Sequence, residues 1–560
     1  MISYLKAFLT ALILVLIFSI ILLSLVPPVS RDALVHHLAV PKLYLQHGSI
    51  YEIPGMIFSY YPMNLDLLYM IPLYFGNDIF PKFIHFAFAI LTAWLIFDYL
   101  KGRLNTAFAL IGILFFLSLP IIIKLSITVY VDLGLIFFST ASLLLLLKWL
   151  GSGFNLKFLI GSGIFCGLAM GTKYNGLVTF FILTLFVPFI YSRYAQGDSP
   201  GFLKAFGQGL IFLLIALLVF SPWMIRNYHW KNNPIYPLYN NFFNPPPVVS
   251  SQNIIPSDSV DKKDDEKKSG SGIFTYRSVI YHETWWQMAL VPLRIFFQGE
   301  DGNFAHFDGK LNPFLLLLPI FAFYRVKEEG QSLGNEKKIL LAFAVLFFLF
   351  AFFSAGMRIR YISPFIPPLV ILSVFGTRNI IEIIKRFRAP IARQTGFTLL
   401  AVILTFFIVL NGAYVADQFR YVDPFPYIKG AVSRDAYISK YRFEYPAMQY
   451  INSHLPTDAL VLFIFIGKRG YYCNRKYITD SIKHLTEFIN IVKTSDTPRK
   501  IWLGLKEKGI THLLVQIVFL TQWDDEIFTV EEQKLLQDFF DDCLTPLYSK
   551  NGVTVFELRE

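Results

Sequence analysis

The stretch Ser30–Gly48, SRDALVHHLAVPKLYLQHG, follows the first hydrophobic segment and carries an aspartate, two histidines and a lysine. Asp32 and His36 are four residues apart, so they would share one face of a helix. Pro41 lacks an N–H and crowds the preceding turn, so we expect it to break the stretch into two short helices, the second ending at Gly48. Such a segment suits a membrane surface better than a membrane span. At this point Asp32 is either a chemical group or only the cap of a helix start.

Composition places the chain among polytopic membrane proteins. Of its 560 residues, 55% are hydrophobic and 17% are aromatic, which leaves too little polar surface for an ordinary soluble protein. The net charge of +11 does not indicate a nucleic-acid partner, because Lys and Arg occur in short clusters between apolar runs rather than in one stripe. The three cysteines show no metal-ligand spacing, and a disulfide between Cys473 and Cys543 remains open.

Apolar runs long enough to cross the hydrocarbon core predict about eleven transmembrane helices, all within residues 1–415. The expected fold class is therefore a polytopic α-helical membrane protein with a soluble C-terminal domain. Residues 27–78 are expected to form an outer loop with surface helices, and residues 223–312 a second long outer loop with a disordered linker at 245–272. Residues 416–560 alternate strand and helix patterns, which predicts an extracytoplasmic α/β or α+β domain.

The distribution of basic residues predicts the orientation. With the N-terminus in the cytoplasm, every inner loop is basic, as the positive-inside rule requires. The first span has no small-residue cleavage pattern after it, so we expect it to remain as a signal anchor. The expected location is the inner (plasma) membrane, with the C-terminal domain and both long loops on the outer side.

Ionisable residues gather at the outer ends of the predicted spans. Asp132 begins the fourth span, Lys173 lies in a break between two spans, and Arg358 and Arg360 form an outer turn. Each alone has a plain explanation as a helix-start acid, a snorkelling lysine or an interface anchor. Together with Asp32 they form a functional-site hypothesis, because charges near membrane spans are costly.

A carboxylate facing several cations at a lipid boundary suits the transfer of a sugar from a polyprenyl phosphate to a hydroxyl. The lipid phosphate leaves as a stable anion, so no general acid is needed, unlike in the hydrolysis of an ordinary glycoside. Asp32 would deprotonate or orient the acceptor, while Lys173 and Arg360 would stabilise charge on the phosphate. A single in-line displacement predicts inversion of the anomeric configuration.

The predicted site has two groups of residues. The predicted catalytic residues are Asp32 and Asp132. The predicted substrate-binding residues are His36, His37, Lys42, Lys173, Tyr174, Arg226, Asn227, Arg358, Arg360 and Tyr361. No cofactor is expected, and a divalent metal is possible but unsupported, because the sequence has no His-x-x-x-His or DxD cluster. Whether Asp66 lines the same cleft or is structural remains open.

These motifs resemble the GT-C superfamily of polyprenyl-phosphate-sugar-dependent glycosyltransferases, particularly the bacterial relatives of aminoarabinose transferase and of protein O-mannosyltransferases. The resemblance rests on SRDALVHHLAVPKLYLQHG, YYPMNLDLLY, YVDLGLIFF, GLAMGTKYNGL, PWMIRNYHWKNNPIYP and RYISPFIPPL, in that order. It implies that Asp32 is the catalytic base of the first outer loop and that Asp132 is the acid at the start of the fourth span. Those enzymes carry two adjacent acids in the first loop. This sequence has Asp32 followed by Ala33, which makes His36 a candidate substitute.

Two alternatives remain. A transporter or flippase of a lipid-linked glycan should show inverted repeats and polar residues at mid-membrane depth. A glycan ligase or polymerase would transfer a whole oligosaccharide. The expected partners are a polyprenyl-phosphate sugar donor, a glycan, lipid or protein acceptor, and membrane lipid, with no nucleic acid.

Overall fold

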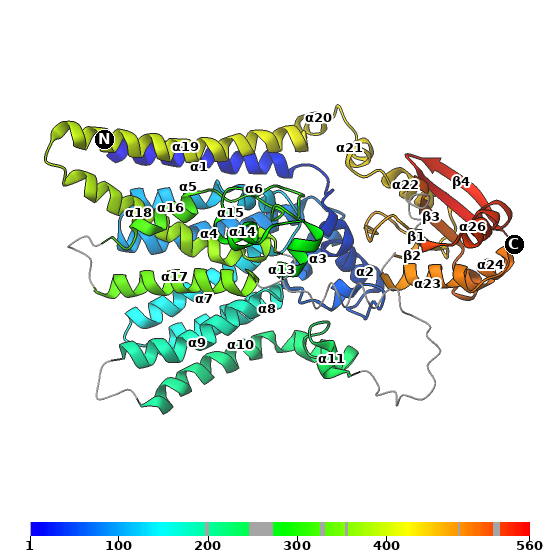
Figure 1. Ribbon diagram of the computed structural model, residues 1–560, viewed down its shortest axis with the longest axis horizontal. Coiled ribbons are helices and arrows are strands. Elements are labelled where there is room, and N and C mark those ends of the chain that lie inside the picture. The colour runs from blue at the N-terminus through cyan, green and yellow to red at the C-terminus, as the bar shows by residue number, and fades with distance from the viewer. Residues whose placement is uncertain are drawn as a thin grey trace.

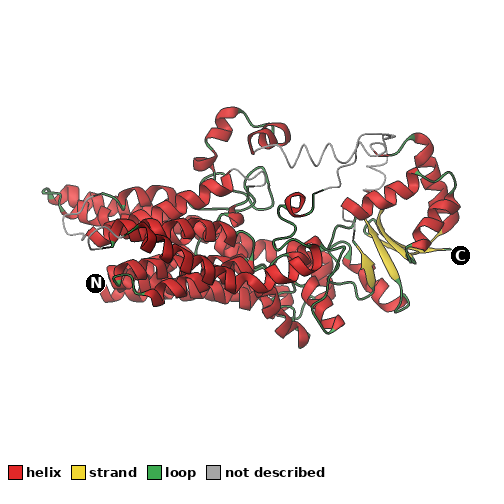
Figure 2. Ribbon diagram, turned by 90° about the horizontal axis from the view of Figure 1, so that it is seen from below, coloured by secondary structure: helices red, strands yellow, loops and turns green. Residues whose placement is uncertain are grey.

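The computed structural model describes residues 2–195, 201–245, 273–324, 331–352, 357–479, 482–518 and 527–559. Long helices run side by side along the long axis of the molecule, and a small sheet domain lies beyond the end of this bundle that is opposite the N-terminus (Figure 1). Figure 2 shows the same division from below, with the strands confined to the end that carries the C-terminus.

The long and apolar helices form the bundle. They are α1 (Ile2–Ser24), α4 (Phe80–Arg103), α5 (Thr106–Leu117), α6 (Pro120–Ser126), α7 (Asp132–Gly151), α8 (Leu156–Thr172), α9 (Gly176–Tyr194), α10 (Phe202–Lys231), α16 (Phe314–Phe321), α17 (Gln331–Phe352), α18 (Ile366–Lys385) and α19 (Pro390–Val422). Shorter helices connect them: η1 (Ala33–His37), α2 (Ala39–His47), η2 (Ile57–Tyr60), α3 (Asn64–Tyr74), α11 (Asn240–Phe243), α13 (Ile273–Ile280), α14 (Trp285–Ala289), α15 (Val291–Arg294), η3 (Ile359–Tyr361) and η4 (Ser363–Phe365).

The membrane-protein fold class is confirmed, and the span count is confirmed roughly. Among the described residues, 7 helices are long and apolar enough to cross a membrane, or 8 if α5 and α6, which meet at 67°, form one broken span. Pro120 begins α6 because it has no N–H with which to continue α5. The remaining predicted spans coincide with shorter or more polar helices, namely α8, α16 and α17.

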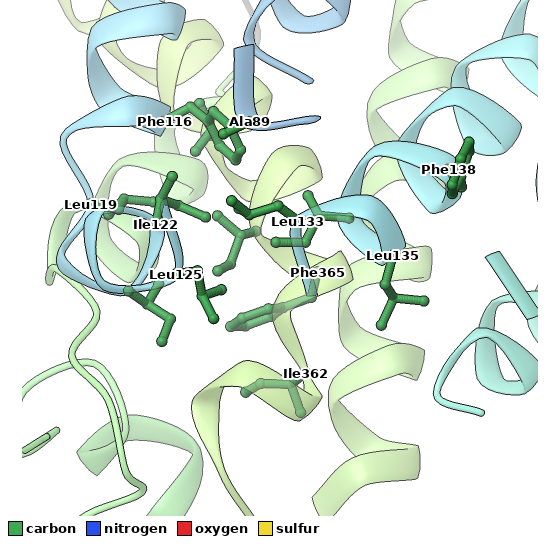
Figure 3. Close-up of a cluster of buried hydrophobic side chains, with 14 of the residues drawn as sticks. Ala89, Phe116, Leu119, Ile122, Leu125, Leu133, Leu135, Phe138, Ile362 and Phe365 are labelled. Carbon is green, nitrogen blue, oxygen red and sulfur yellow. The ribbon is translucent and has the colours of Figure 1, made fainter. Parts of the chain in front are cut away.

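A cluster of buried side chains fixes the start of α7. Figure 3 shows Leu133 of α7 among side chains of α6, which include Ile122, and of η4, which include Phe365. Leu133 and Ile122 are fully buried and Phe365 nearly so. Such close packing leaves these elements little freedom to shift relative to one another. Asp132 is next to Leu133 in the sequence, and Arg360 is two residues before Ile362, another member of the cluster. The packing of the cluster therefore also fixes the backbone at Asp132 and Arg360.

The break in the first outer loop is not where the sequence predicted it. The chain forms two short helices, η1 and α2, but they meet at Leu38, and Pro41 is the third residue of α2. The prediction that Pro41 causes the break is wrong, because N–H groups in the first turn of a helix have no partner to lose. Gly48 does end α2, with φ of 79°.

The C-terminal domain is a five-stranded sheet with helices, which confirms the predicted α/β or α+β layer. It contains α20 (Pro424–Ile428), α21 (Arg434–Tyr441), α22 (Tyr445–His454), β1 (Leu460–Ile464), β2 (Lys476–Ile478), α23 (Ile482–Lys493), α24 (Pro498–Glu507), β3 (His512–Gln516), α26 (Val530–Cys543), β4 (Leu544–Lys550) and β5 (Val553–Leu558). The strand order is β2-β1-β3-β5-β4; β1 is parallel to β2 and β3, and β5 is antiparallel to β3 and β4.

Three sequence predictions have different outcomes here. Cys473 and Cys543 are both free and belong to separate hydrophobic clusters of the domain, so the disulfide that the sequence left open is not formed. The predicted linker at 245–272 lies outside the described residues apart from residue 245. The predicted domain and loop boundaries stay predictions; α10 continues past residue 223, and α19 continues past residue 416.

Candidate active site

A cavity of about 1330 Å³ lies at the end of the bundle that faces the sheet domain. Its walls come from the loop after α1, from α3, from the breaks that precede α7 and α9, from η3, and from the chain that leads into and through the C-terminal domain. Apolar side chains of bundle helices also line it; they include Leu23 of α1, Val178 of α9, and Phe347 and Phe350 of α17. The cavity therefore joins hydrocarbon-like and charged surfaces.

Asp32 forms an ion pair with Arg360 in the cavity wall. The guanidinium Nη1 donates to Asp32 Oδ2 at 2.6 Å. Asp32 precedes η1 but makes no side-chain hydrogen bond to it, so the helix-cap explanation of this residue finds no support. Burial alone would raise the pKa of the Asp32 carboxyl, but the charge of Arg360 holds that pKa well below its usual range.

Asp132 forms a second ion pair, with Lys173. Lys173 Nζ, in the break between α8 and α9, donates to Asp132 Oδ1 at 2.6 Å. Asp132 is fully buried, and its Oδ2 has no hydrogen-bond partner within the described part of the chain. Lys173 lines the cavity, whereas Asp132 lies behind it. Burial alone would lower the pKa of Arg360, but the carboxylates of Asp32 and Asp132 together raise it well above its usual value. The two ion pairs therefore form one electrostatic cluster.

A histidine–carboxyl pair adjoins this cluster. His37 Nδ1 lies 2.7 Å from Asp66 Oδ1, and the His36 ring stacks on Phe58 with a centroid separation of 4.5 Å. Burial lowers the pKa of His37 to about 3 and raises that of Asp66 to about 7. His37 is therefore a neutral imidazole near neutral pH. Asp66, which the sequence left open, lines the cavity.

Metal ligands do not gather here. Within the described ranges, no group of three or more His, Cys, Asp and Glu side chains could hold a metal ion. His36 is half-buried against Phe58, and His37 is buried beside Tyr130 with one acid, Asp66, in contact.

Three of the predicted substrate-binding residues, Tyr174, Arg358 and Tyr361, also line the cavity. The Arg358 guanidinium lies 4.2 Å from the centroid of the Phe304 ring, and Lys173 Nζ lies 5.0 Å from that of Tyr361. The negative face of an aromatic ring attracts a cation, so these contacts help to hold both groups in position at the cavity wall.

Three predicted substrate-binding residues are not brought to the cavity. Arg226 Nη2 and Asn227 Nδ2 donate to the Tyr60 carbonyl at 2.6 and 2.9 Å, and so fasten the first outer loop to α10. Lys42 Nζ donates to the Tyr471 carbonyl of the C-terminal domain at 2.6 Å. These side chains bind neighbouring segments of the chain around the cavity, and none of these contacts indicates that they bind substrate.

Sequence reasoning missed another part of the wall. Lys124 Nζ bridges Asp301 and Asp308 at 3.1 and 3.0 Å, and all three line the cavity. The segment EDGNFAHFDG, with its two aspartates in an aromatic outer loop, was the signal for them. Arg442 and Lys468 reach the wall from the C-terminal domain, and nothing in their local sequence marks them.

Comparisons with known proteins agree with this architecture. Residues 68–225 match the family model described as dolichyl-phosphate-mannose-protein mannosyltransferase. No curated protein matches the sequence. The fold is similar to ArnT from Cupriavidus metallidurans in the apo state, with 12% identity and a TM-score of 0.55 over 98% of this chain and 97% of that chain. The same enzyme bound to undecaprenyl phosphate gives 12% identity and a TM-score of 0.54 over the same shares of the two chains. The Archaeoglobus fulgidus oligosaccharyltransferase gives 11% identity and a TM-score of 0.52 over 92% of this chain and 70% of that chain.

The matched family and these solved structures are glycosyltransferases of the GT-C superfamily. The resemblance drawn from the sequence motifs is thus confirmed, together with the enzyme class that it implied. At 11–12% identity the solved structures show that the fold is shared, so the substrates of this protein must be argued from its own cavity.

Proposed function

We propose that this protein transfers a sugar from a polyprenyl-phosphate-linked donor to a hydroxyl of an acceptor at the outer face of the inner membrane, with inversion. The observation that carries the proposal is one cavity lined by Asp32, Arg360 and Lys173 and by apolar side chains of bundle helices, with Asp32 paired to Arg360, and Lys173 paired to Asp132 directly behind the wall. Both pairs lie at one end of the helical bundle rather than at its middle, which favours chemistry at the membrane surface over transport.

The donor would span both kinds of wall. Its isoprenoid chain suits the apolar lining side chains of helices α9 and α17, which contact each other, and its phosphate suits Lys173, Arg358 and Arg360. The fold shared with an enzyme solved with undecaprenyl phosphate supports this class of donor.

Arg360 would couple donor binding to the basicity of Asp32. While Arg360 is paired with Asp32, the Asp32 carboxyl is held ionised and is a weak base. A donor phosphate competes for the guanidinium, and the half-buried Asp32 carboxylate then becomes more basic. Asp32 takes the proton of the acceptor hydroxyl as its oxygen attacks the anomeric carbon. The bond from that carbon to the phosphate oxygen breaks, and the lipid phosphate leaves as an anion beside Arg360 and Lys173. Asp132 keeps Lys173 in position.

Reconstitution tests this proposal. The protein in liposomes would be given a panel of polyprenyl-phosphate sugars, and released lipid phosphate would be measured for wild type, Asp32→Asn and Asp98→Asn. Asp98 is a matched control because it also pairs with a cation, Lys148 at 3.5 Å, but is exposed and outside the cavity. We expect one or more donors to be consumed by wild type and Asp98→Asn, and a loss of about 10²- to 10⁴-fold in Asp32→Asn.

Other outcomes point elsewhere. Equal release by wild type and Asp32→Asn with every active donor would show that Asp32 is not the base. Movement of lipid-linked glycan across the bilayer with no release of lipid phosphate would indicate a transporter. Turnover of a lipid-linked oligosaccharide but of no single-sugar donor would indicate a ligase or polymerase.

A further inference from the structure

We propose that the C-terminal domain is the positioning element of the catalytic loop: one turn of it, residues 471–474, together with Arg442, holds residues 28–42 on both sides of Asp32. The catalytic consequence rests on the proposed function, whereas the mechanical part does not. No substrate contact is assigned to these residues.

The far side of the loop is held by Lys42. Its Nζ donates to the carbonyls of Tyr471 at 2.6 Å and Cys473 at 3.0 Å, and to Asn474 Oδ1 at 2.8 Å. An ammonium group has three donors, and all three are used by one turn of the C-terminal domain. Because a partly buried ammonium group needs such acceptors, this contact fixes α2 against that turn.

The near side of the loop is held by the same turn and by Arg442. The Tyr472 hydroxyl donates to the Pro28 carbonyl at 2.8 Å, and the Arg442 guanidinium donates to the Val29 carbonyl. Between the two sides, the Tyr471 N–H donates to the carbonyl of Leu34 at 3.2 Å. Leu34 lies in η1, directly after Asp32 and Ala33, so the turn reaches the backbone next to the catalytic carboxylate.

The backbone of η1 is in a conformation that local hydrogen bonding seldom favours by itself. η1 is a five-residue π-helix without a side-chain cap at its start, and isolated π-helical turns are rare. The C-terminal domain also contacts the bundle at Asp78: the hydroxyl of Tyr471, in the turn, lies 3.3 Å from Asp78 Oδ2, and Arg434 of α21 pairs with the same oxygen at 2.5 Å. Asp78 precedes α4, so the C-terminal domain contacts both the loop and the start of a membrane helix, and it holds the two in a fixed relative position.

This arrangement separates two functions. Arg360 and Lys173 belong to the helical bundle, whereas the backbone on both sides of Asp32 is also bonded to the C-terminal domain. Loosening the turn should therefore misplace the base and leave the phosphate-binding cations where they are. The expected signature is a fall in kcat with an unchanged KM for the lipid donor.

The test compares Lys42→Met with Lys337→Met in the full-length reconstituted protein. Lys337 is a matched control, since its buried Nζ also donates to a backbone carbonyl, that of Ala322 at 3.0 Å, away from the loop and the cavity. Hydrogen exchange would be measured for the amides of residues 30–42 and for the amide of Tyr471. We expect faster exchange at these amides in Lys42→Met only, a fall in kcat of about 10²-fold, an unchanged donor KM, and partial rescue by Lys42→Arg.

Asn474→Ala removes a single acceptor and serves if Lys42→Met does not fold; it should change the same amides in the same direction by less. Unchanged exchange at residues 30–42 in a folded Lys42→Met or Asn474→Ala protein would overturn the proposal. So would a raised donor KM with unchanged kcat, which would make Lys42 a substrate ligand. If wild type turns over no donor, the proposed function fails, but the exchange measurement still decides whether the domain holds the loop.

Discussion

The two catalytic-site acids differ in what surrounds them. Asp32 reaches the cavity and pairs with Arg360, whereas Asp132 is fully buried and bound to Lys173. Removing one partner of a buried ion pair leaves an uncompensated charge and typically costs about 3–5 kcal/mol. The structure therefore favours proton transfer at Asp32 and support of Lys173 by Asp132, although the sequence predicted both as catalytic.

Substitution of Arg360 should change the pH profile of the reaction. Asp32 acts as a base only when ionised, so kcat/KM falls as the pH drops through its pKa. Arg360 now holds this pKa well below 3.8; in Arg360→Gln burial is no longer offset by the guanidinium, so the pKa rises. We expect the acidic limb of kcat/KM to move upward by about one pH unit or more.

Arg358→Gln is the control for this measurement, since Arg358 also lines the cavity but its acidic neighbour is Asp308, at 3.8 Å. It should lower activity and leave the limb where it is in wild type. An unmoved limb in Arg360→Gln would mean that Asp32 does not control the reaction.

At the scale of elements, the charged residues of the site lie at the ends of helices. Asp132 begins α7, Lys173 follows α8, and Arg360 lies in η3 before α18. Each of these polar groups therefore lies at or next to the end of a bundle helix. The helices behind them must pack closely to keep these ends together. Gly376 of α18 marks one such close approach, against α16.

A side chain at Gly376 should force these two helices apart. A Cβ there would overlap the Leu318 carbonyl oxygen, which is backbone and cannot rotate away. We expect Gly376→Ala to destabilise the protein by about 1–3 kcal/mol, measured as a lower temperature of thermal unfolding in detergent. Gly412→Ala is the matched control: it adds the same methyl group to helix α19 in open space, and should stabilise by up to about 1 kcal/mol. Equal stability of Gly376→Ala and wild type would show that α16 and α18 can separate freely.

At the scale of the molecule, the cavity end of the bundle and the sheet domain share one side. α1 and α19 run alongside each other, and the chain passes from the end of α19 into the sheet domain (Figure 1). The charge pattern of the loops predicts that this side lies outside the cytoplasm. The orientation is a prediction from sequence and needs a chemical test.

Cysteine labelling supplies that test, because all three native cysteines are buried and give little background. We expect Val530→Cys, at an exposed position of the sheet domain, to react with a membrane-impermeant maleimide in intact cells. Arg388→Cys, exposed between α18 and α19, should react only after the cells are opened. The reverse pattern would invert the topology.

The sequence by itself determined the helices and most of the charged groups. An apolar run of membrane-spanning length must form a helix, because only a helix satisfies its backbone hydrogen bonds within the bilayer. An acid or a cation at the end of such a run is easily recognised in the sequence. Asp32, Lys173 and Arg360 were therefore predicted together, and so was the alternation of strands and helices in the C-terminal domain. Local reasoning erred at Pro41, where a position in the first turn of a helix removed the expected penalty.

Only the tertiary structure decided which charges meet. Arg360 pairs with Asp32 and Lys173 with Asp132, and Lys42, predicted for the substrate, binds the C-terminal domain. These partners are far apart in the chain, and the interactions that select them depend on distances of a few ångströms and on burial, which no local pattern encodes. Periodicity and span length act within one segment; ion pairing and cavity shape arise only after segments are packed together.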